Sequence, residues 1–183
     1  GGGDKNLMPL GGVPLLSRVM ERAVPAGLSV IINANGDADR FAGFGLPVVA
    51  DVIEGFAGPL AGVLTGLETA AKHHGDITHV VSLATDAPFL PRDLVMRLCS
   101  AVADGADMAQ ARSHGRRHPV FAIWPVALAP ALRRALVDDG LRKIDDFTSA
   151  YNCAIVDFEG EPDPFTNVNS PDDFAQAEAL IAG

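Results

Sequence analysis

The sequence has few cysteines and no long apolar run. Only Cys99 and Cys153 are cysteines among its 183 residues, they lie far apart, and neither belongs to a CxxC pair. Two isolated thiols are typical of a reduced, cytoplasmic compartment and do not form a zinc-ligand pattern. A membrane-spanning helix needs roughly 20 consecutive apolar residues, and no such run is present. We therefore expect a cytoplasmic protein with no membrane partner.

Basic residues are scarce relative to acidic ones. The chain has 14 Lys and Arg against 23 Asp and Glu, which gives a net charge of −9. This balance argues against a nucleic-acid surface, which needs a basic patch. It permits an anionic small substrate beside a divalent cation, because carboxylates hold Mg²⁺ next to phosphates. HExxH, GxSxG and a Ser/His/Asp order are also absent, so a hydrolase mechanism has no support.

The chain does have a regular alternation of predicted strands and helices. Apolar runs typical of buried strands occur at 28–32, 46–50, 79–84 and 153–158, with helices between and after them at 59–74, 91–102, 127–138, 142–149 and from 171. Residues 108–112 and 119–123 form a strand pair whose short connection implies antiparallel pairing. The pattern predicts one α/β domain over residues 1–183, a three-layer α/β/α, Rossmann-like fold with a mostly parallel sheet and one antiparallel strand.

The first residues combine glycines with a lysine. Gly1, Gly2 and Gly3 are followed by Asp4 and Lys5. This order is typical of a phosphate-binding loop, because glycine lets backbone N–H groups approach an anion and a lysine offsets its charge. In α/β proteins such a loop follows a strand, and none precedes it here. On these residues alone, the remnant of a disordered tag explains the start equally well.

Polar residues follow several of the predicted strands. Asn33, Asp51 and Asp86 each come after such a strand, and Asn167 and Asn169 precede the last helix. The carboxyl ends of parallel strands are where open α/β sheets bind ligands, and a carboxylate there can hold Mg²⁺. Turn or capping roles explain each residue singly. Their recurrence favours a nucleoside-triphosphate site with one metal.

Two further features have alternative interpretations. Gly58 and Pro59 open the helix at 59, and Gly62 lies within its first turns. Because glycine inside a helix costs roughly 1 kcal/mol relative to alanine, we expect close approach there of either a ligand or the sheet. Arg116 and Arg117 lie in a predicted hairpin tip, which is either a solvated turn or a lip that receives an anionic substrate.

Six sequence motifs occur in the same order as in a known protein family. DKNLMPLGGVPLL, VIINANG, VVADVIEGFAGPLAG, LATDAPFLP, RRHPVFAIW and FTNVNSPDDF span nearly the whole chain. Together they resemble the molybdenum cofactor guanylyltransferases, which have a nucleotidyltransferase fold. The resemblance implies transfer of GMP from GTP to the phosphate of molybdopterin carrying molybdenum, release of pyrophosphate, and Mg²⁺ as cofactor. It also implies transient contact with cofactor-assembly proteins and molybdoenzymes.

The resemblance assigns roles to single residues. It implies two catalytic residues, Lys5 as the lysine of the phosphate loop and Asp86 as the Mg²⁺ ligand. The remaining implied contacts, to GTP or on the pterin or metal side of the cleft, are Gly2, Gly3, Asn33, Asp51, Gly58, Pro59, Leu60, Asn167 and Asn169.

The start of the chain departs from the family pattern. The family has a strand and LAGGxSxRMG ahead of the DK, and only GGGDK corresponds to that segment here. A central strand is hard to lose, because its neighbours would keep unpaired backbone groups. We therefore expect that this sequence is incomplete at its N-terminus and lacks the first strand and part of the phosphate loop. Two alternatives remain open: cytidylyl transfer to the same pterin, and a nucleotide-binding module without catalysis.

Overall fold

A computed structural model describes residues 5–55, 58–73 and 75–182. Its strands are β1 (Pro9–Leu10), β2 (Val13–Pro14), β3 (Ile32–Asn33), β4 (Val48–Val49), β5 (His79–Ser82), β6 (Met108–Ser113), β7 (Arg116–Pro125) and β8 (Cys153–Asp157). Its helices are α1 (Leu15–Ala23), α2 (Pro59–His73), α3 (Leu94–Ala103), α4 (Ala129–Val137), α5 (Ile144–Thr148) and α6 (Pro171–Ala182), with 3-10 turns η1 (Lys5–Leu7), η2 (Ala38–Phe44) and η3 (Val126–Leu128). No helix of this described part is long and apolar enough to cross a membrane.

The main sheet contains four strands in the order β5-β7-β6-β8. Strand β7 is antiparallel to both β5 and β6, whereas β6 and β8 are parallel. The prediction of a mostly parallel sheet was therefore wrong, and the sheet is mixed. The reason is the position of β7: because the one reversed strand lies between two others, it makes two of the three pairings antiparallel. Strands β3 and β4 form a separate parallel pair, and β1 and β2 a small hairpin.

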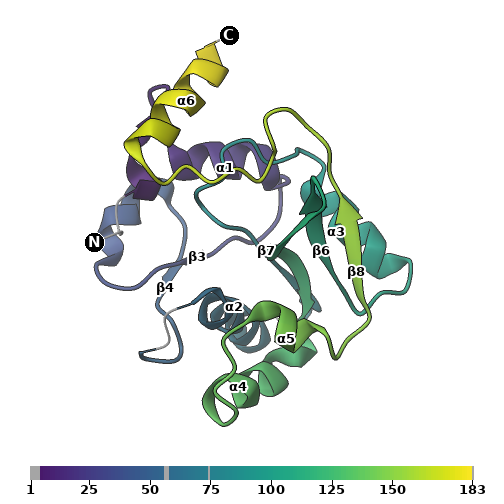
Figure 1. The fold of residues 1–183 in the computed structure, drawn as a ribbon. Coiled ribbons are helices and arrows are strands. Elements are labelled where there is room, and N and C mark those ends of the chain that lie inside the picture. Colours follow the sequence, from purple (N-terminus) through teal and green to yellow (C-terminus); the bar gives the residue numbers. More distant parts are fainter. Residues whose placement is uncertain (1–4, 56–57, 74, 183) are drawn as a thin grey trace.

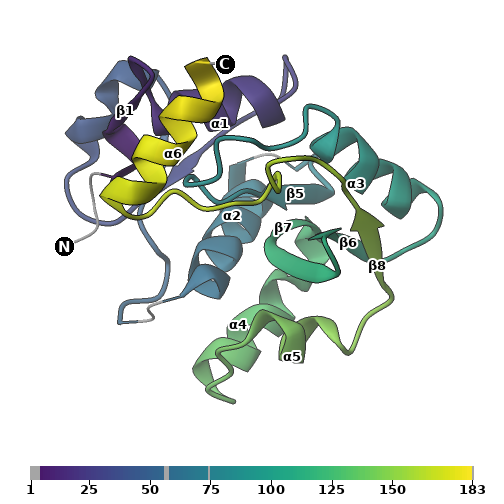
Figure 2. The same cartoon turned by 45° about the horizontal axis from the view of Figure 1, so that its top comes forward.

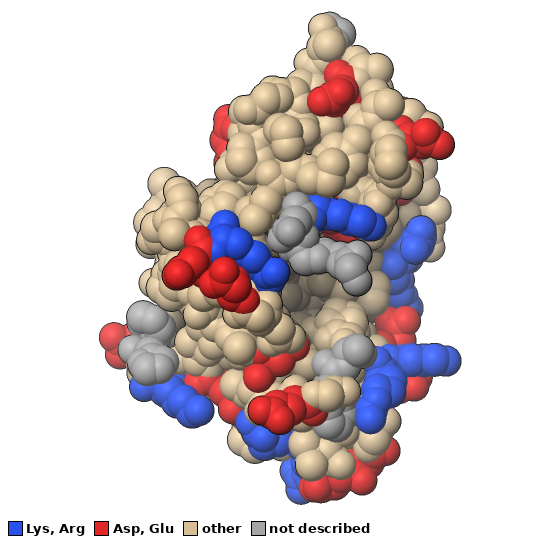
Figure 3. Space-filling view, turned by 90° about the vertical axis from the view of Figure 1, so that its left-hand side faces the viewer, with Lys and Arg blue, Asp and Glu red and all other residues tan. Residues whose placement is uncertain are grey.

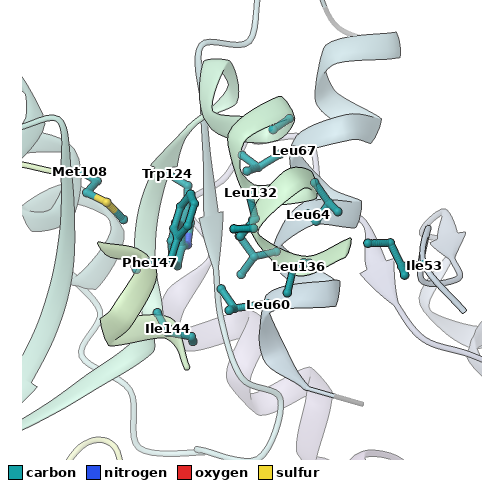
Figure 4. Close-up of a cluster of buried hydrophobic side chains, with 14 residues drawn as sticks. Ile53, Leu60, Leu64, Leu67, Met108, Trp124, Leu132, Leu136, Ile144 and Phe147 are labelled. Carbon is teal, nitrogen blue, oxygen red and sulfur yellow. The ribbon is translucent and has the colours of Figure 1, made fainter. Parts of the chain in front are cut away.

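Helices cover both faces of the four-stranded sheet, as the alternation of strands and helices predicts (Figures 1 and 2). Successive residues of a strand face opposite sides, and β7 divides accordingly. Ala122 and Trp124 pack with α2, α4 and α5, and Figure 4 shows Trp124 among the leucines of α2 and α4. Phe121 and Ile123 pack on the other face with α1 and α3.

Two further contacts fix the outer helices. The Arg133 guanidinium of α4 donates to both carboxylate oxygens of Glu68 on α2, at 2.6 and 2.8 Å. Helix α6 begins with a reciprocal cap: Ser170 Oγ accepts from the Asp173 N–H at 3.2 Å, and Asp173 Oδ2 accepts from the Ser170 N–H at 2.8 Å. Ser170 is therefore the N-cap of α6.

A cavity of about 680 Å³ lies between β3 and β5. Its walls are mainly apolar and come from both sheets and from helices α1 and α2; they include Leu16, Met20, Val30, Ile31, Ile32, Gly62, Gly66, Val80, Val81 and Ser82. Each of the two strands pairs on one side only within the described residues, β3 with β4 and β5 with β7. Of the strand predicted at 28–32, only Ile32 belongs to a ladder, together with Asn33, which follows it.

Candidate active site

The first group of polar residues joins the carboxyl ends of β3 and β4. Asn33 Nδ2 donates to Asp51 Oδ1 at 3.0 Å, and Asn35 Nδ2 donates to Asp51 Oδ2 at 2.8 Å. Asn35 Oδ1 in turn accepts from the Asp51 N–H at 2.8 Å. Both oxygens of the Asp51 carboxylate are thus held in place, and each keeps further lone pairs for a donor on a ligand.

Gly62 in helix α2 allows this group to form. A Cβ at position 62 would lie 2.5 Å from Asn33 Oδ1, which is closer than side chains approach one another. At Gly66, one turn later, a Cβ would meet a Val80 methyl group at an ordinary 3.4 Å. The close approach of the Asn33 side chain therefore favours glycine at 62, because a Cβ there would displace the Asn33 amide.

The start of helix α2 faces the same cavity. Gly58 and Pro59 are exposed and line the cavity together with Asn33 and Asp51. Gly58 has a φ of 157°, which favours glycine. Leu60 is 2 % exposed and packs in the core beneath α2, so its backbone N–H, and not its side chain, is the part available at the helix N-terminus.

The second group centres on Asp86, which follows β5. Burial raises the pKa of the Asp86 carboxyl, although the neighbouring Asn169 side chain and the Lys5 ammonium act to lower it. Asp86 Oδ1 is buried and has no hydrogen-bond partner among the residues that the structure describes. The Asp86 carbonyl accepts from the Val168 N–H at 2.7 Å. The fold thus brings Lys5, Asp86 and Asn169 together, as the sequence predicts, although they lie in three separate motifs.

The donor set at Asp86 fits Mg²⁺. A buried carboxylate oxygen without a partner is costly unless a ligand satisfies it. Mg²⁺ at a nucleotide site uses one or two carboxylates, with water and substrate phosphates completing its shell. Across the part of the chain that the structure describes, no three His, Cys, Asp or Glu side chains gather as a metal site. Asp86 is therefore the carboxylate that would hold Mg²⁺ here, with water and substrate phosphates as further ligands.

The two groups open on the same cavity. Asn33, Asp51, Gly58 and Pro59 belong to its lining, and so does Thr85, the residue before Asp86. Figure 3 views the side of the molecule on which β3 and β4 lie in Figure 1, and it shows a hollow with charged side chains around it. A molecule that lies across the ends of β3 and β5 could place its polar head at Asp51 and its phosphates near Lys5 and Asp86.

The remaining predicted residues have different outcomes. Gly2 and Gly3 lie outside the described residues. Asn167 is exposed two positions before Asn169, and its contact with a ligand stays a prediction. Asn35 was not among the residues predicted for the site. The Asn-Ala-Asn spacing was the available signal, because residues two apart on an extended chain project to the same side.

Comparisons with known proteins agree with this arrangement. The sequence model of the MobA-like NTP transferase domain family matches residues 1–152. The chain is 53% identical over 182 residues to a molybdenum cofactor guanylyltransferase of Rhodopseudomonas palustris, covering 98% of this chain and 87% of the relative. It is 48% identical over 186 residues to one of Mesorhizobium japonicum, covering 99% and 89%.

Solved structures show the same fold at lower identity. Molybdopterin-guanine dinucleotide biosynthesis protein A of Archaeoglobus fulgidus superimposes with a TM-score of 0.76 at 22% identity, over 97% of this chain and 90% of that one. The 2-C-methyl-D-erythritol 4-phosphate cytidylyltransferase of Thermus thermophilus gives 0.72 at 23% identity, over 99% and 95%. Together with the family match and the close relatives, these likenesses show that the chain is a nucleotidyltransferase that belongs to the MobA-like family, in the group of molybdenum cofactor guanylyltransferases.

Proposed function

We propose that this protein transfers GMP from GTP to molybdopterin carrying molybdenum, forming the guanine dinucleotide cofactor and releasing pyrophosphate. Family membership supports the reaction. The observation that carries it in the structure is that the Asn33–Asp51 group follows β3 and β4 and that Asp86 follows β5, so both polar groups lie beyond the ends of the strands that flank the cavity. That arrangement suits a nucleotide, which has hydrogen-bond donors at one end and phosphates at the other.

At the nucleoside end, Asp51 is the recognising group. Its carboxylate is an acceptor, so it selects N–H or O–H groups on the base or ribose. Asn33 and Asn35 donate hydrogen bonds to its two oxygens. The Asp51 side chain therefore loses less conformational entropy when GTP binds. Gly58 and Pro59 leave the N-terminus of α2 open toward the phosphates, and backbone N–H groups at a helix N-terminus favour anions.

At the reacting end, the chain's own residues position charge. The pterin phosphate attacks the α-phosphorus of GTP, a P–O bond forms there, and the bond to the β-phosphate oxygen breaks as pyrophosphate leaves. Lys5 offsets the negative charge that develops on the leaving group. Asp86 would hold Mg²⁺, which supplies charge neutralisation across the phosphates. Such transfers depend mainly on positioning and electrostatics, so the site needs no dedicated general base.

We also propose that an apolar strand of the same polypeptide, from outside residues 1–183, occupies the cavity between β3 and β5. Two strand edges that each lack a partner on the cavity side support this, as do the apolar walls supplied by helices on both faces. One inserted strand would satisfy the backbone groups of both edges, because neighbouring strands lie about 4.8 Å apart. It would join the two ladders and carry the glycines of the phosphate loop to Lys5.

Amide hydrogen exchange tests this strand. In the full-length polypeptide we expect strong protection of the amides of residues 30–32 and 80–82. In a protein limited to residues 1–183 the edge-facing amides among them should exchange quickly. Equal, fast exchange in both proteins would rule the strand out, and slow exchange in both would show that residues 1–183 close the gap themselves.

A competition assay tests the reaction and the choice of nucleotide. With full-length protein, Mg²⁺ and molybdenum-loaded molybdopterin, GTP should give pyrophosphate, and equimolar CTP should reduce the rate little. Preference for CTP would identify a cytidylyltransferase. GTP binding without pyrophosphate release would identify a binding module. Cytoplasmic location and transient contacts with cofactor-assembly proteins and molybdoenzymes are proposed with this function, supported by the family alone.

A further inference from the structure

A hydrogen-bonded cluster outside the cavity joins the β6–β7 hairpin to the loop between β8 and α6. Ser113, which ends β6, is 1% exposed. Its Oγ lies 2.7 Å from His118 Nε2 on β7 and 2.7 Å from Asp163 Oδ1 in the loop. Asp163 Oδ1 also accepts from the Phe165 N–H at 3.0 Å. A buried serine hydroxyl thus links two titratable side chains from different elements.

The direction of each hydrogen bond follows from the proton count. Burial raises the pKa of the Asp163 carboxyl, but hydrogen bonds from Ser113 and the Phe165 N–H outweigh this, and the pKa lies below its usual value. An ionised carboxylate only accepts, so the single Ser113 proton points to Asp163. His118 Nε2 must then donate to Ser113 Oγ. The cluster therefore requires a proton on Nε2 of His118.

This order of groups does not make an activated nucleophile. In a hydrolytic triad the histidine lies between the serine and the carboxylate and removes the serine proton. Here the serine lies in the middle and donates to the carboxylate, while the histidine donates to the serine. The cluster therefore fixes the β6–β7 hairpin to the loop between β8 and α6 and takes no part in covalent catalysis.

Aromatic packing strengthens the same connection. The His118 ring stacks on the Phe165 ring with centroids 4.5 Å apart and planes 19° apart. Phe121 and Phe158 pack against Phe165 edge-on, at 5.0 and 5.6 Å. Phe165 is 4% exposed. The hairpin and the loop are therefore fixed to each other at residues 163–165 by both hydrogen bonds and ring contacts.

The loop reaches Asp86 within the next four residues. The Val168 N–H donates to the Asp86 carbonyl at 2.7 Å, and the Asn169 side chain acts on the Asp86 carboxylate. Val168 is 1% exposed. A shift of the loop at Asp163 would thus be transmitted through a short, buried segment to the carboxylate that faces the phosphates.

We propose that His118 and Asp163, linked through Ser113, are positioning residues for nucleotidyl transfer, because they anchor the loop that holds Val168 and Asn169 against Asp86. The inference rests on the proposed function for its kinetic consequences, but the cluster itself is defined without any substrate. Its residues act through Asp86 and do not touch the reacting atoms.

The first test replaces the central hydroxyl. In full-length protein, Ser113→Ala should lower kcat by about 10- to 100-fold, since a misplacement of about 1 Å can cost 100-fold. The Mg²⁺ concentration for half-maximal rate should rise, and the Kd for GTP without metal should stay within about twofold. Thr148→Ala is the matched control: it removes another buried hydroxyl, 4% exposed, whose bond to the Asp145 carbonyl lies in α5. It should keep kcat and the Mg²⁺ midpoint, even where it lowers Tm.

The second test uses His118 itself. His118→Gln keeps a side-chain N–H that can reach Ser113 Oγ and should retain most of kcat. His118→Leu should lose activity to the level of Ser113→Ala. In nitrogen-15 spectra of the wild type, neutral His118 should carry its proton on Nε2. A proton on Nδ1, or a wild-type kcat and Mg²⁺ midpoint in Ser113→Ala, would overturn the inference. Absence of GMP transfer by the wild type would instead refute the proposed function, and the nitrogen-15 result would still decide the cluster.

Discussion

Asp86→Asn distinguishes two expected effects of the Asp86 carboxylate: its effect on the stability of the metal-free protein and its effect on catalysis. Burial raises the folded-state pKa of Asp86 above its unfolded value of about 3.9. The contribution of such a group to stability is fully present below the unfolded pKa and is lost as the pH rises through the folded pKa. In the metal-free protein, burial therefore disfavours the ionised carboxylate, whose Oδ1 is buried and has no hydrogen-bond partner among the described residues. Asp86→Asn removes that charge with little change of shape, so the variant should be at least as stable as the wild type without metal.

The same substitution should abolish most of the activity. No group of three or more His, Cys, Asp or Glu side chains gathers as a metal site in the described part of the chain, so the expected metal site depends on Asp86. Losing one principal electrostatic group costs at least about 100-fold in kcat, which corresponds to about 2.7 kcal/mol of transition-state stabilisation at 1.36 kcal/mol for each tenfold. We expect a loss of this size, together with loss of the Mg²⁺-dependent rise in Tm that we expect for the wild type with GTP.

Three measurements on full-length protein decide this prediction: pyrophosphate release under saturating substrates, thermal unfolding without metal, and thermal unfolding with Mg²⁺ and GTP. Asp51→Asn serves as a matched control, because it removes a carboxylate of the same cavity that we place at the nucleoside end. It should raise the KM for GTP and leave the Mg²⁺ midpoint near its original value. Near-normal GMP transfer by Asp86→Asn would refute the assignment of Asp86.

The other predictions concern helices and packing. Gly62→Ala should raise the KM for GTP several-fold, because its Cβ would displace Asn33; Gly66→Ala, with its ordinary 3.4 Å contact, should leave KM unchanged. Ser170→Ala should lower the free energy of unfolding by about 1 kcal/mol in urea titrations, through loss of the α6 cap. The hydrogen bond from Arg133 on α4 lowers the pKa of Glu68 on α2. The Glu68–Arg133 pair therefore stabilises the fold above the unfolded pKa of Glu68, about 4.3. This stabilisation is lost as the pH falls through the lower folded pKa. Unfolding curves of Glu68→Gln should accordingly show a weaker loss of stability between pH 5 and 3, and an unchanged acid limb would contradict this.

The sequence allowed the elements to be predicted better than their pairing. Ser170 followed by Pro171 marked the start of α6, and apolar periodicity located α2, because both signals are local. The position of β7 between β5 and β6 was not predictable in this way, since strand order depends on contacts between distant segments. The short lengths of β3 and β4 were unpredictable for the same reason. The apolar run at 28–32 was visible in the sequence, but only Ile32 of this run, with Asn33 after it, pairs with β4.

The sequence indicated which site residues follow strands, but it did not indicate which side chains hold those residues in position. Asp51 and Asp86 follow apolar runs, so their place at a sheet edge could be inferred. The role of Asn35 depends on its bonds to Asp51 across β3 and β4. His118 and Asp163, which are linked through Ser113, lie 45 residues apart in the sequence. Local sequence patterns do not predict contacts over such a separation.

The central claim is the transfer of GMP to the pterin, and isotopic labelling of GTP tests it most directly. The full-length protein is incubated with Mg²⁺ and molybdenum-loaded molybdopterin, and with GTP labelled at either the α- or the γ-phosphate. We predict that the α-label appears in a pterin dinucleotide and that the γ-label appears in pyrophosphate, in equal amounts. Label from the α-phosphate that stays in GTP or appears only in free GMP would contradict the account.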